Sequence, residues 1–236
     1  GKSYSLTVMA CFSTVEHVLN AQGPLPPALD FDGAELLACD VARLAEYMTR
    51  GGAKCETVTS LVLRRCQVGA NSVGMRAAGI TSASDAATIA CDDATSAVRA
   101  LAELLRTNTR LQVLDLWGCA LTDDDIRMLC RGITGNTDSA LRVLNLGYNS
   151  ITTEGARVLA DCCCKARSLC TLTLGSSRLP VRRIFEAGAK KNGELKLAGL
   201  SVGPLSAIVV GLLARRGGGL TSLDVSGNVL RKEGTN

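Results

Sequence analysis

The residues that could do acid–base or nucleophilic chemistry are few, because the chain of 236 residues holds one histidine, His17. Without that residue no nucleophile–histidine–carboxylate set can form. His17 lies in a segment with helical spacing, 8–19, far along the chain from any strong motif. We therefore expect His17 to be a surface or helix-capping residue, and we expect the protein not to be an enzyme.

The eleven cysteines are the second group that could do chemistry, as metal ligands, redox groups or disulfide partners. Zinc sites usually combine two cysteine pairs with a few residues between the members of each pair. Here Cys162, Cys163 and Cys164 are adjacent, and adjacent side chains point in different directions around a helix. The odd count and the lack of a visible extracellular targeting segment favour reduced, buried thiols in an intracellular compartment, most simply the cytoplasm. We expect no bound metal and no cofactor.

Any binding site must be positioned by a pattern that recurs along the chain. The pattern L-x-x-L-x-L-x-x-N/C-x-L occurs at 111–121, 141–151 and 220–230, with weaker copies at 29–36, 58–68, 169–179 and 194–202. Because side chains alternate in a strand, Leu114 and Leu116 point to the same side. The pattern predicts about seven short strands. It places these side chains in the core of one parallel sheet: Leu61, Leu63, Leu114, Leu116, Leu144, Leu146, Leu172, Leu174, Leu223 and Val225.

The Asn or Cys position of the pattern comes just after each strand, where the backbone turns inward. The side chains of Asn149 and Asn228 can hydrogen-bond backbone groups that this turn leaves unpaired. Cysteine makes such bonds weakly but packs well in an apolar slot. Ser177 and Leu200 hold the position in two later copies. Leucine cannot make these bonds, so we expect an irregular turn at Leu200.

Helical spacing appears between the strand copies, at 41–48, 97–106, 153–163 and 206–214. Pro204 precedes the last of these, at a point where a missing N–H costs little. The sequence G-x-x-x-L-A followed by L-x-x-L-x-L-x-x-N/C-x-L resembles the ribonuclease-inhibitor-like class of leucine-rich repeats. The resemblance extends over most of the chain, from about Leu29 to Leu230. It implies an α/β fold, a curved leucine-rich-repeat solenoid with parallel strands on the concave face and helices on the convex face.

The domain organisation follows from where the pattern begins and is interrupted. We expect a solenoid over 25–236, preceded by an N-terminal helix or partial repeat at 1–24. Residues 69–95 are rich in Ala, Ser, Thr and Gly and too long for a linking loop, so they form an expected insertion. The chain stops at the opening of a further helix, which suggests an uncapped C-terminal end and a fragment of a longer protein. No run of about 18 apolar residues occurs, so no membrane contact is expected.

The outward positions of the strands offer the best candidate for a binding surface. When Leu114 and Leu116 point inward, Asp115 and Trp117 point to the concave face. Adding the equivalent positions of neighbouring copies gives the candidate partner-binding residues Arg64, Arg65, Asp115, Trp117, Asn145 and Tyr148. Trp, Tyr and Arg dominate the binding energy of protein interfaces, so we expect another protein to dock here. The alternative is that Trp117 folds over its own repeat and covers the edge of the core.

Charge is distributed unevenly along the chain. Residues 1–164 hold 14 Lys and Arg against 18 Asp and Glu, whereas residues 165–216 hold 10 against 2. The candidate basic patch consists of Arg182, Arg183, Lys190, Lys191 and Lys196, with Arg215 and Arg216 nearby in sequence. Such a patch could contact an acidic protein or RNA in a salt-sensitive way. Aromatic side chains, which would stack on bases, are not interleaved with it.

Three functions remain open at this point. The first is a non-catalytic protein–protein interaction scaffold within a larger protein or assembly. The second is a structural subunit of a large assembly, such as a flagellar axoneme or a ribonucleoprotein, that contacts acidic or RNA surfaces through the basic half. The third is a regulator of an enzyme such as a small GTPase, because Ran GTPase-activating proteins are similar in repeat type. No functional loop of such a regulator can be matched to this sequence.

Overall fold

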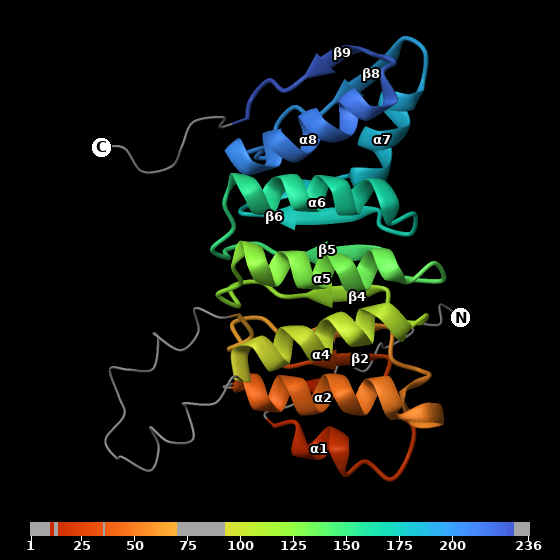
Figure 1. The fold of residues 1–236 in the computed structure, drawn as a ribbon, viewed down its shortest axis with the longest axis vertical. Coiled ribbons are helices and arrows are strands. Elements are labelled where there is room, and N and C mark those ends of the chain that lie inside the picture. The colour runs from red at the N-terminus through yellow and green to blue at the C-terminus, as the bar shows by residue number, and fades with distance from the viewer. Residues whose placement is uncertain (1–9, 12–13, 35, 70–92, 229–236) are drawn as a thin grey trace, which may run out of the picture.

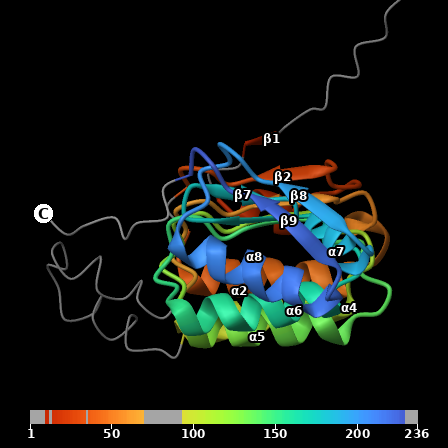
Figure 2. The same ribbon diagram turned by 90° about the horizontal axis from the view of Figure 1, so that it is seen from above.

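Strands and helices alternate along the chain and stack in layers (Figure 1). The computed structural model describes residues 10–11, 14–34, 36–69 and 93–228. The strands are β1 (Ala10–Cys11), β2 (Ala28–Asp30), β3 (Ser60–Val62), β4 (Val113–Asp115), β5 (Val143–Asn145), β6 (Thr171–Leu174), β7 (Ser177–Leu179), β8 (Gly193–Lys196) and β9 (Leu220–Asp224). The helices are α1 (Glu16–Leu19), α2 (Ala38–Arg50), the 3₁₀ turn η1 (Gly52–Cys55), α4 (Asp93–Thr107), α5 (Asp123–Gly135), α6 (Thr153–Lys165), α7 (Val181–Ala189) and α8 (Pro204–Gly217). Seen from above, the strands line one side of the stack and the long helices line the other (Figure 2).

The strands form two sheets. Strands β1 to β6 run parallel and pair in chain order, and β7 pairs antiparallel to β6 at the edge. The register aligns equivalent positions of the repeat, because Leu61 pairs with Leu114, Leu114 with Leu144 and Leu144 with Leu172. Strands β8 and β9 form a second, parallel pair. Side chains at equivalent outward positions of β2 to β6 therefore lie side by side.

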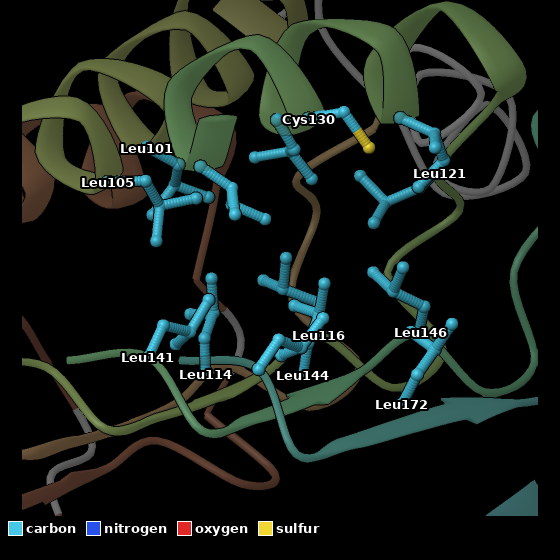
Figure 3. Packing of buried hydrophobic residues seen from close by; sticks show 14 of the residues in the cluster. Leu101, Leu105, Leu114, Leu116, Leu121, Cys130, Leu141, Leu144, Leu146 and Leu172 are labelled. Carbon is cyan, nitrogen blue, oxygen red and sulfur yellow. The ribbon is translucent and has the colours of Figure 1, made fainter. Parts of the chain in front are cut away.

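Leucine side chains from the strands and the helices meet in a continuous core (Figure 3). Leu114 and Leu144 of the strands are at most 1% exposed, and Leu101 and Leu105 of α4 pack in the same core. Full burial of one such side chain contributes roughly 1.5–3 kcal/mol. The repeated burial fixes the spacing of the strands and so positions the outward side chains.

The helix ends follow from their sequences. Helix α5 begins after Thr122, and the carboxylate of Asp125 accepts a hydrogen bond from the backbone N–H of Thr122 at 2.8 Å, as in a capping box. Helix α8 begins at Pro204, which needs no N–H partner there. It ends at Gly217 and is capped by Gly218, whose φ of 69° is the left-handed conformation that glycine adopts readily. These capping residues thus fix where α5 begins and where α8 begins and ends.

The asparagine position of the repeat ties neighbouring layers together. Asn149 Oδ1 accepts hydrogen bonds from the N–H groups of Cys119 and Leu121, at 2.9 and 3.0 Å. Its Nδ2 donates to the carbonyl of Leu116 at 2.9 Å. Asn228 bonds the layer before it in the same way, through the Val202 N–H and the Leu197 carbonyl. The side chain thus satisfies turn groups that burial would otherwise leave unpaired.

The prediction of one parallel sheet with ten buried side chains is wrong at its C-terminal end. Ser177 begins strand β7 instead of closing a turn, and the antiparallel β7 ends the first sheet at Leu179. Leu223 is 43% exposed and Val225 is only partly buried. A solenoid layer buries its leucines between two neighbouring repeats. Strand β9 pairs with β8 on one side, and no described strand pairs with its other edge.

Two other expectations meet the structure in part. The helix expected over 8–19 is reduced, among its described residues, to α1, because Ala10–Cys11 forms strand β1. Leu200 lies exposed in its turn, between Gly199 and Ser201, which both have positive φ. Most of the expected insertion over 69–95 falls at 70–92, outside the described residues, and α4 begins at Asp93.

Candidate partner-binding surface

A short polar turn ends strands β2, β4 and β5 of the first sheet in the same way. Asp115 Oδ1 accepts a hydrogen bond from the N–H of Trp117, and Asn145 Oδ1 accepts one from the N–H of Gly147, both at 3.0 Å. Asp30 makes the equivalent bond to the Asp32 N–H at 2.9 Å. Short polar side chains that bond the backbone two residues later are typical of such turns. Asp115 and Asn145 therefore have a structural role besides any role in binding.

The third residue after each of the strands β2, β3, β4, β5, β8 and β9 adopts a left-handed backbone. It is glycine in four repeats, at Gly33, Gly118, Gly199 and Gly227, with φ between 64° and 78°. In the other two it is Arg65, with φ 61°, and Tyr148, with φ 55°. A residue with a side chain pays roughly 1–2 kcal/mol for this conformation, whereas glycine adopts it freely. The two repeats that bear Arg65 and Tyr148 thus have a less favourable backbone than the fold requires.

Ion pairs join three neighbouring strand ends. Arg64 Nε donates to Asp115 Oδ2 at 3.1 Å, and Arg65 Nη2 donates to Asp32 Oδ1 at 2.7 Å. Arg64 also reaches Asp32, with Nη1 and Oδ2 3.6 Å apart, and Asn145 Nδ2 donates to Asp115 Oδ2 at 3.0 Å. The hydrogen bond from Arg65 holds the pKa of Asp32 below its ordinary value, and the charge of Arg64 acts in the same direction. The arginines are therefore held in place although their outer nitrogens face solvent.

Two aromatic rings extend this network across the sheet. The ring centroids of Trp117 and Tyr148 lie 4.8 Å apart with planes tilted by 48°, and the Arg64 guanidinium carbon lies 5.8 Å from the Trp117 ring centroid. Trp117 is half-buried, and a Cβ added at Gly147 would come within 2.8 Å of its ring. Tyr148 is 65% exposed. The rings form a ledge whose inner part rests on the next repeat and whose outer part faces solvent.

The structure places close together all six residues that the sequence predicted for this surface. It adds Asp32, which sequence reasoning missed although it is the outward residue equivalent to Arg64 in the weak copy at 29–36. The strand-end cluster consists of Asp32, Arg64, Arg65, Asp115, Trp117, Asn145 and Tyr148. Trp117 lies against Gly147 of the following repeat. A packing role and a binding role are thus compatible for Trp117.

The candidate basic patch is spread over two layers of the fold. Arg182 and Arg183 are exposed on helix α7, and Lys190 and Lys191 follow it, whereas Lys196 lies on strand β8 opposite Asp224. Arg182 Nε donates to Glu186 Oε1 at 2.8 Å. Arg216 pairs with Asp161, and Arg215 is exposed beside it on α8. The positive charge of this half is therefore partly neutralised and divided between helices and strands.

The cysteines whose side chains the structure describes have free thiols, and several are buried. Burial raises the pKa of the Cys66 thiol to about 12. Burial also raises the pKa of Cys119, whose Sγ lies 2.9 Å from the carbonyl oxygen of Leu63. No group of three metal-binding side chains occurs in the part of the chain that the structure describes. No described helix has the length and apolar character needed to cross a membrane.

A hollow of about 710 Å³ lies on the opposite, helical side between α2, α4 and α5. Its arginines include Arg50 and Arg106, which pair with Glu46 and Glu103 on their own helices. Such exposed pairs are typical of a solvated helix face and contribute little energy. The hollow is far from the strand-end cluster, because helices and strands occupy opposite sides of the stack (Figure 2).

Comparison with known proteins agrees with the architecture. A family model described as "Leucine Rich repeat" matches residues 107–130 and 139–160. The mouse (Mus musculus) protein "NACHT, LRR and PYD domains-containing protein 4C" is 32% identical over 103 residues, which is 42% of this chain and 10% of that protein. The similar region thus spans a small part of the relative's length. These matches and the repeating strand–helix layers confirm the predicted curved leucine-rich-repeat solenoid. Leucine-rich-repeat domains are typically non-catalytic and commonly mediate protein–protein interaction.

Proposed function

We propose that this chain is a non-catalytic protein-binding scaffold whose partner docks on the concave face at the strand-end cluster. The observation that supports this most is the left-handed backbone of Arg65 and Tyr148. Four equivalent positions hold glycine, so the fold itself has no need of a large side chain there. A large side chain that occupies a strained backbone position, where glycine would be free of strain, suggests a function for that side chain.

The composition of the cluster supports the same proposal. Arginine, tryptophan and tyrosine supply most of the energy at protein interfaces. The aromatic side chains bury large areas and freeze few rotatable bonds, and the planar guanidinium pairs with carboxylates and stacks on rings. The rings of Trp117 and Tyr148 are in tilted contact, and the Arg64 guanidinium lies over the Trp117 ring. Tyr148 is 65% exposed, an unusual exposure for a ring that packs against a neighbour. The helices of 13 to 15 residues, α2, α4, α5, α6 and α8, also favour the ribonuclease-inhibitor-like subclass.

Site-specific crosslinking followed by binding measurements tests the proposal. A photo-crosslinking amino acid at Thr173, an outward position on β6 beside Asn145, should label the docked protein. The same amino acid at the exposed Arg157 of α6, on the helical side, should not. Trp117→Ala should then weaken binding of the labelled partner by roughly 2 kcal/mol, about thirtyfold. Leu200→Ala removes an exposed apolar side chain outside the cluster and should leave binding unchanged.

A second candidate is a structural subunit of a large assembly that binds an acidic surface or RNA through the basic half. It is supported by the 10 basic residues against 2 acidic ones over 165–216. In that case the double change Arg182→Glu and Arg183→Glu should weaken binding strongly and in a salt-dependent way. Normal binding by Trp117→Ala together with lost binding by the double variant would replace the concave-face proposal with this one.

A further inference from the structure

We infer that the partner of this surface is an acidic protein segment with an apolar side chain, lying across strands β3 to β7 between the Arg64–Arg65 pair and Arg178. The inference rests on the proposed function and names its partner class. It adds one binding residue, Arg178, that belongs neither to the strand-end cluster nor to the candidate basic patch. The segment's carboxylates would meet the arginines, and its apolar side chain would meet Trp117 and Tyr148.

Arg178 reaches the concave face because of the β6–β7 hairpin. Arg178 lies directly opposite Thr173 across this antiparallel pair, while Leu172 lies opposite Leu179. Opposed residues of an antiparallel pair project to the same face. Both leucines are buried in the core, so Thr173 and Arg178 project outward, and Arg178 is exposed. Thr173 in turn aligns with Asn145 of the cluster. No ion pair joins Arg178 to a carboxylate of the described residues.

The hydrogen-bonding capacity of the cluster favours an anionic partner. Both carboxylate oxygens of Asp32 face arginine nitrogens, and those of Asp115 accept from Trp117 N–H, Arg64 and Asn145. Arginine offers five N–H donors. Among the described residues, the recorded partner of the Arg65 guanidinium is Asp32 through Nη2, and the side chain is 60% exposed. A carboxylate can therefore add bonds, whereas a cation would first have to displace an arginine.

The spacing fits a short extended peptide. Neighbouring strands lie roughly 4.8 Å apart, so β3 and β7 are separated by about 19 Å. An extended chain spans that distance with roughly six residues. Trp117 and Tyr148 follow β4 and β5, between the two arginine positions. A segment with an apolar residue flanked on both sides by acidic residues therefore matches the order of the surface.

A nucleic acid matches the surface less well. Single-stranded RNA tracks a continuous positive groove, because each of its nucleotides bears a phosphate. Here Asp30, Asp32 and Asp115 lie among the cations, and Arg64 and Arg65 are already paired with two of them. A peptide can place its few carboxylates at the arginines and neutral groups opposite the aspartates. The charge pattern thus favours an acidic protein segment.

The single tryptophan of the chain, Trp117, gives a direct test, because its fluorescence reports binding at the ledge itself. The full chain is titrated with three tryptophan-free twelve-residue peptides that share a central Phe-Leu, flanked by Glu and Asp, by Lys and Arg, or by Gln and Ser, and with an oligouridylate. We expect the acidic peptide to change Trp117 fluorescence and to bind about tenfold more tightly than the Gln/Ser peptide. Arg178→Gln should weaken it about threefold, and the matched change Arg157→Gln on α6 should not.

The possible results separate this inference from the proposed function. Equal or tighter binding of the neutral or basic peptide overturns the acidic class, and tighter binding of the oligouridylate replaces it with nucleic acid. If the crosslinked protein partner loses affinity with Trp117→Ala but not with Arg178→Gln, the scaffold function stands and the acidic-segment inference fails. If calorimetry, which needs no tryptophan, shows that the acidic peptide binds Trp117→Ala as tightly as the parent, the peptide docks elsewhere and the inference also fails.

Discussion

The strand ends of β3–β5 and those of β8–β9 have the same backbone but different side chains. At the end of β9, Asp224 Oδ1 accepts a hydrogen bond from the Ser226 N–H at 3.0 Å, and Gly227 has a left-handed backbone. At the end of β4, Asp115 accepts the equivalent bond from the Trp117 N–H, and Gly118 has the left-handed backbone. The large residues of β3–β5 are replaced there by Ala198, Gly199, Ser226 and Gly227. The fold thus requires a left-handed residue after each of these strands, and it requires no arginine or aromatic ring. Whatever Arg64, Arg65, Trp117 and Tyr148 do is separate from forming the turn.

The largest expected difference between the two regions concerns the core. Leu144 on β5 is 1% exposed, whereas Leu223 on β9 is 43% exposed. Leu144→Asp would bury an unpaired charge and should cost roughly 4 kcal/mol or more, enough to unfold the neighbouring repeats. Leu223→Asp should cost at most about 1 kcal/mol, because water reaches the new carboxylate. Urea unfolding followed by circular dichroism measures both. Equal losses would show that the assigned register of β5 is wrong.

The asparagine position should show a smaller contrast. Asn149→Ala removes hydrogen bonds to the Cys119 and Leu121 N–H groups and to the Leu116 carbonyl, which lie in the interior of the stack. Leaving such groups unpaired should lower the free energy of unfolding by roughly 3 kcal/mol. Asn228→Ala should cost less, roughly 2 kcal/mol, because the Val225 carbonyl that Asn228 also bonds belongs to a partly buried residue, where water can replace the lost bond. The comparison fails if Asn228→Ala is the more damaging change in the same unfolding experiment.

Exchanging residues at the left-handed position tests the separation of fold and function. Tyr148→Gly should raise the free energy of unfolding by about 1 kcal/mol, because glycine relieves the backbone, and should weaken partner binding. Gly227→Tyr should lower stability by a similar amount without creating binding. Calorimetry gives the stabilities, and titration with the crosslinked partner gives the affinities. A Tyr148→Gly variant that loses stability would mean that the ring's packing outweighs the strain.

The smallest expected effect is a difference between two carboxylates. The pKa of Asp32 is lowered mainly by the Arg65 hydrogen bond, and that of Asp224 mainly by hydrogen bonds from Ser226. A lowered pKa stabilises the folded state above the ordinary value near 3.8, and this contribution is lost as pH falls through the folded-state value. Carboxyl resonances followed by NMR should show Arg65→Gln raising the pKa of Asp32 alone and Ser226→Ala raising that of Asp224 alone. A shift of both by either change would contradict these causes.

Much of the molecule is predictable because local pattern and tertiary packing agree. The repeat pattern places the strands from β3 to β6 and the helices between them, since each leucine needs the next layer for burial. The same pattern gives a wrong prediction at Ser177–Leu179. Residues 169–179 match the pattern, but the chain turns back after β6 and forms the antiparallel strand β7. That choice depends on the edge of β6, a tertiary feature that spacing along the chain does not encode.

Part of the strand-end cluster was predictable for a similar reason, whereas its side-chain conformations were not. Alternation and register suffice to bring Arg64, Trp117 and Tyr148 together. They do not give the rotamers that pair both arginines with Asp32 or lay Trp117 over Gly147. The position of Arg178 could not be predicted from the sequence, because its place on the concave face depends on the β6–β7 hairpin.

The hairpin also divides the solenoid as a folding unit. The backbone hydrogen-bond ladder runs from β1 to β7 and begins anew at β8, and across this break α8 packs against α6 and β7. In a repeat protein, opening propagates through nearest-neighbour contacts and stops where they weaken. We therefore expect native-state hydrogen exchange to reveal two cooperative units, with β8, β9 and α8 opening before β3 to β6. A ligand that spans β3 to β7 would slow the hydrogen exchange of backbone amides in β3 to β7 and leave the exchange of β8 and β9 nearly unchanged.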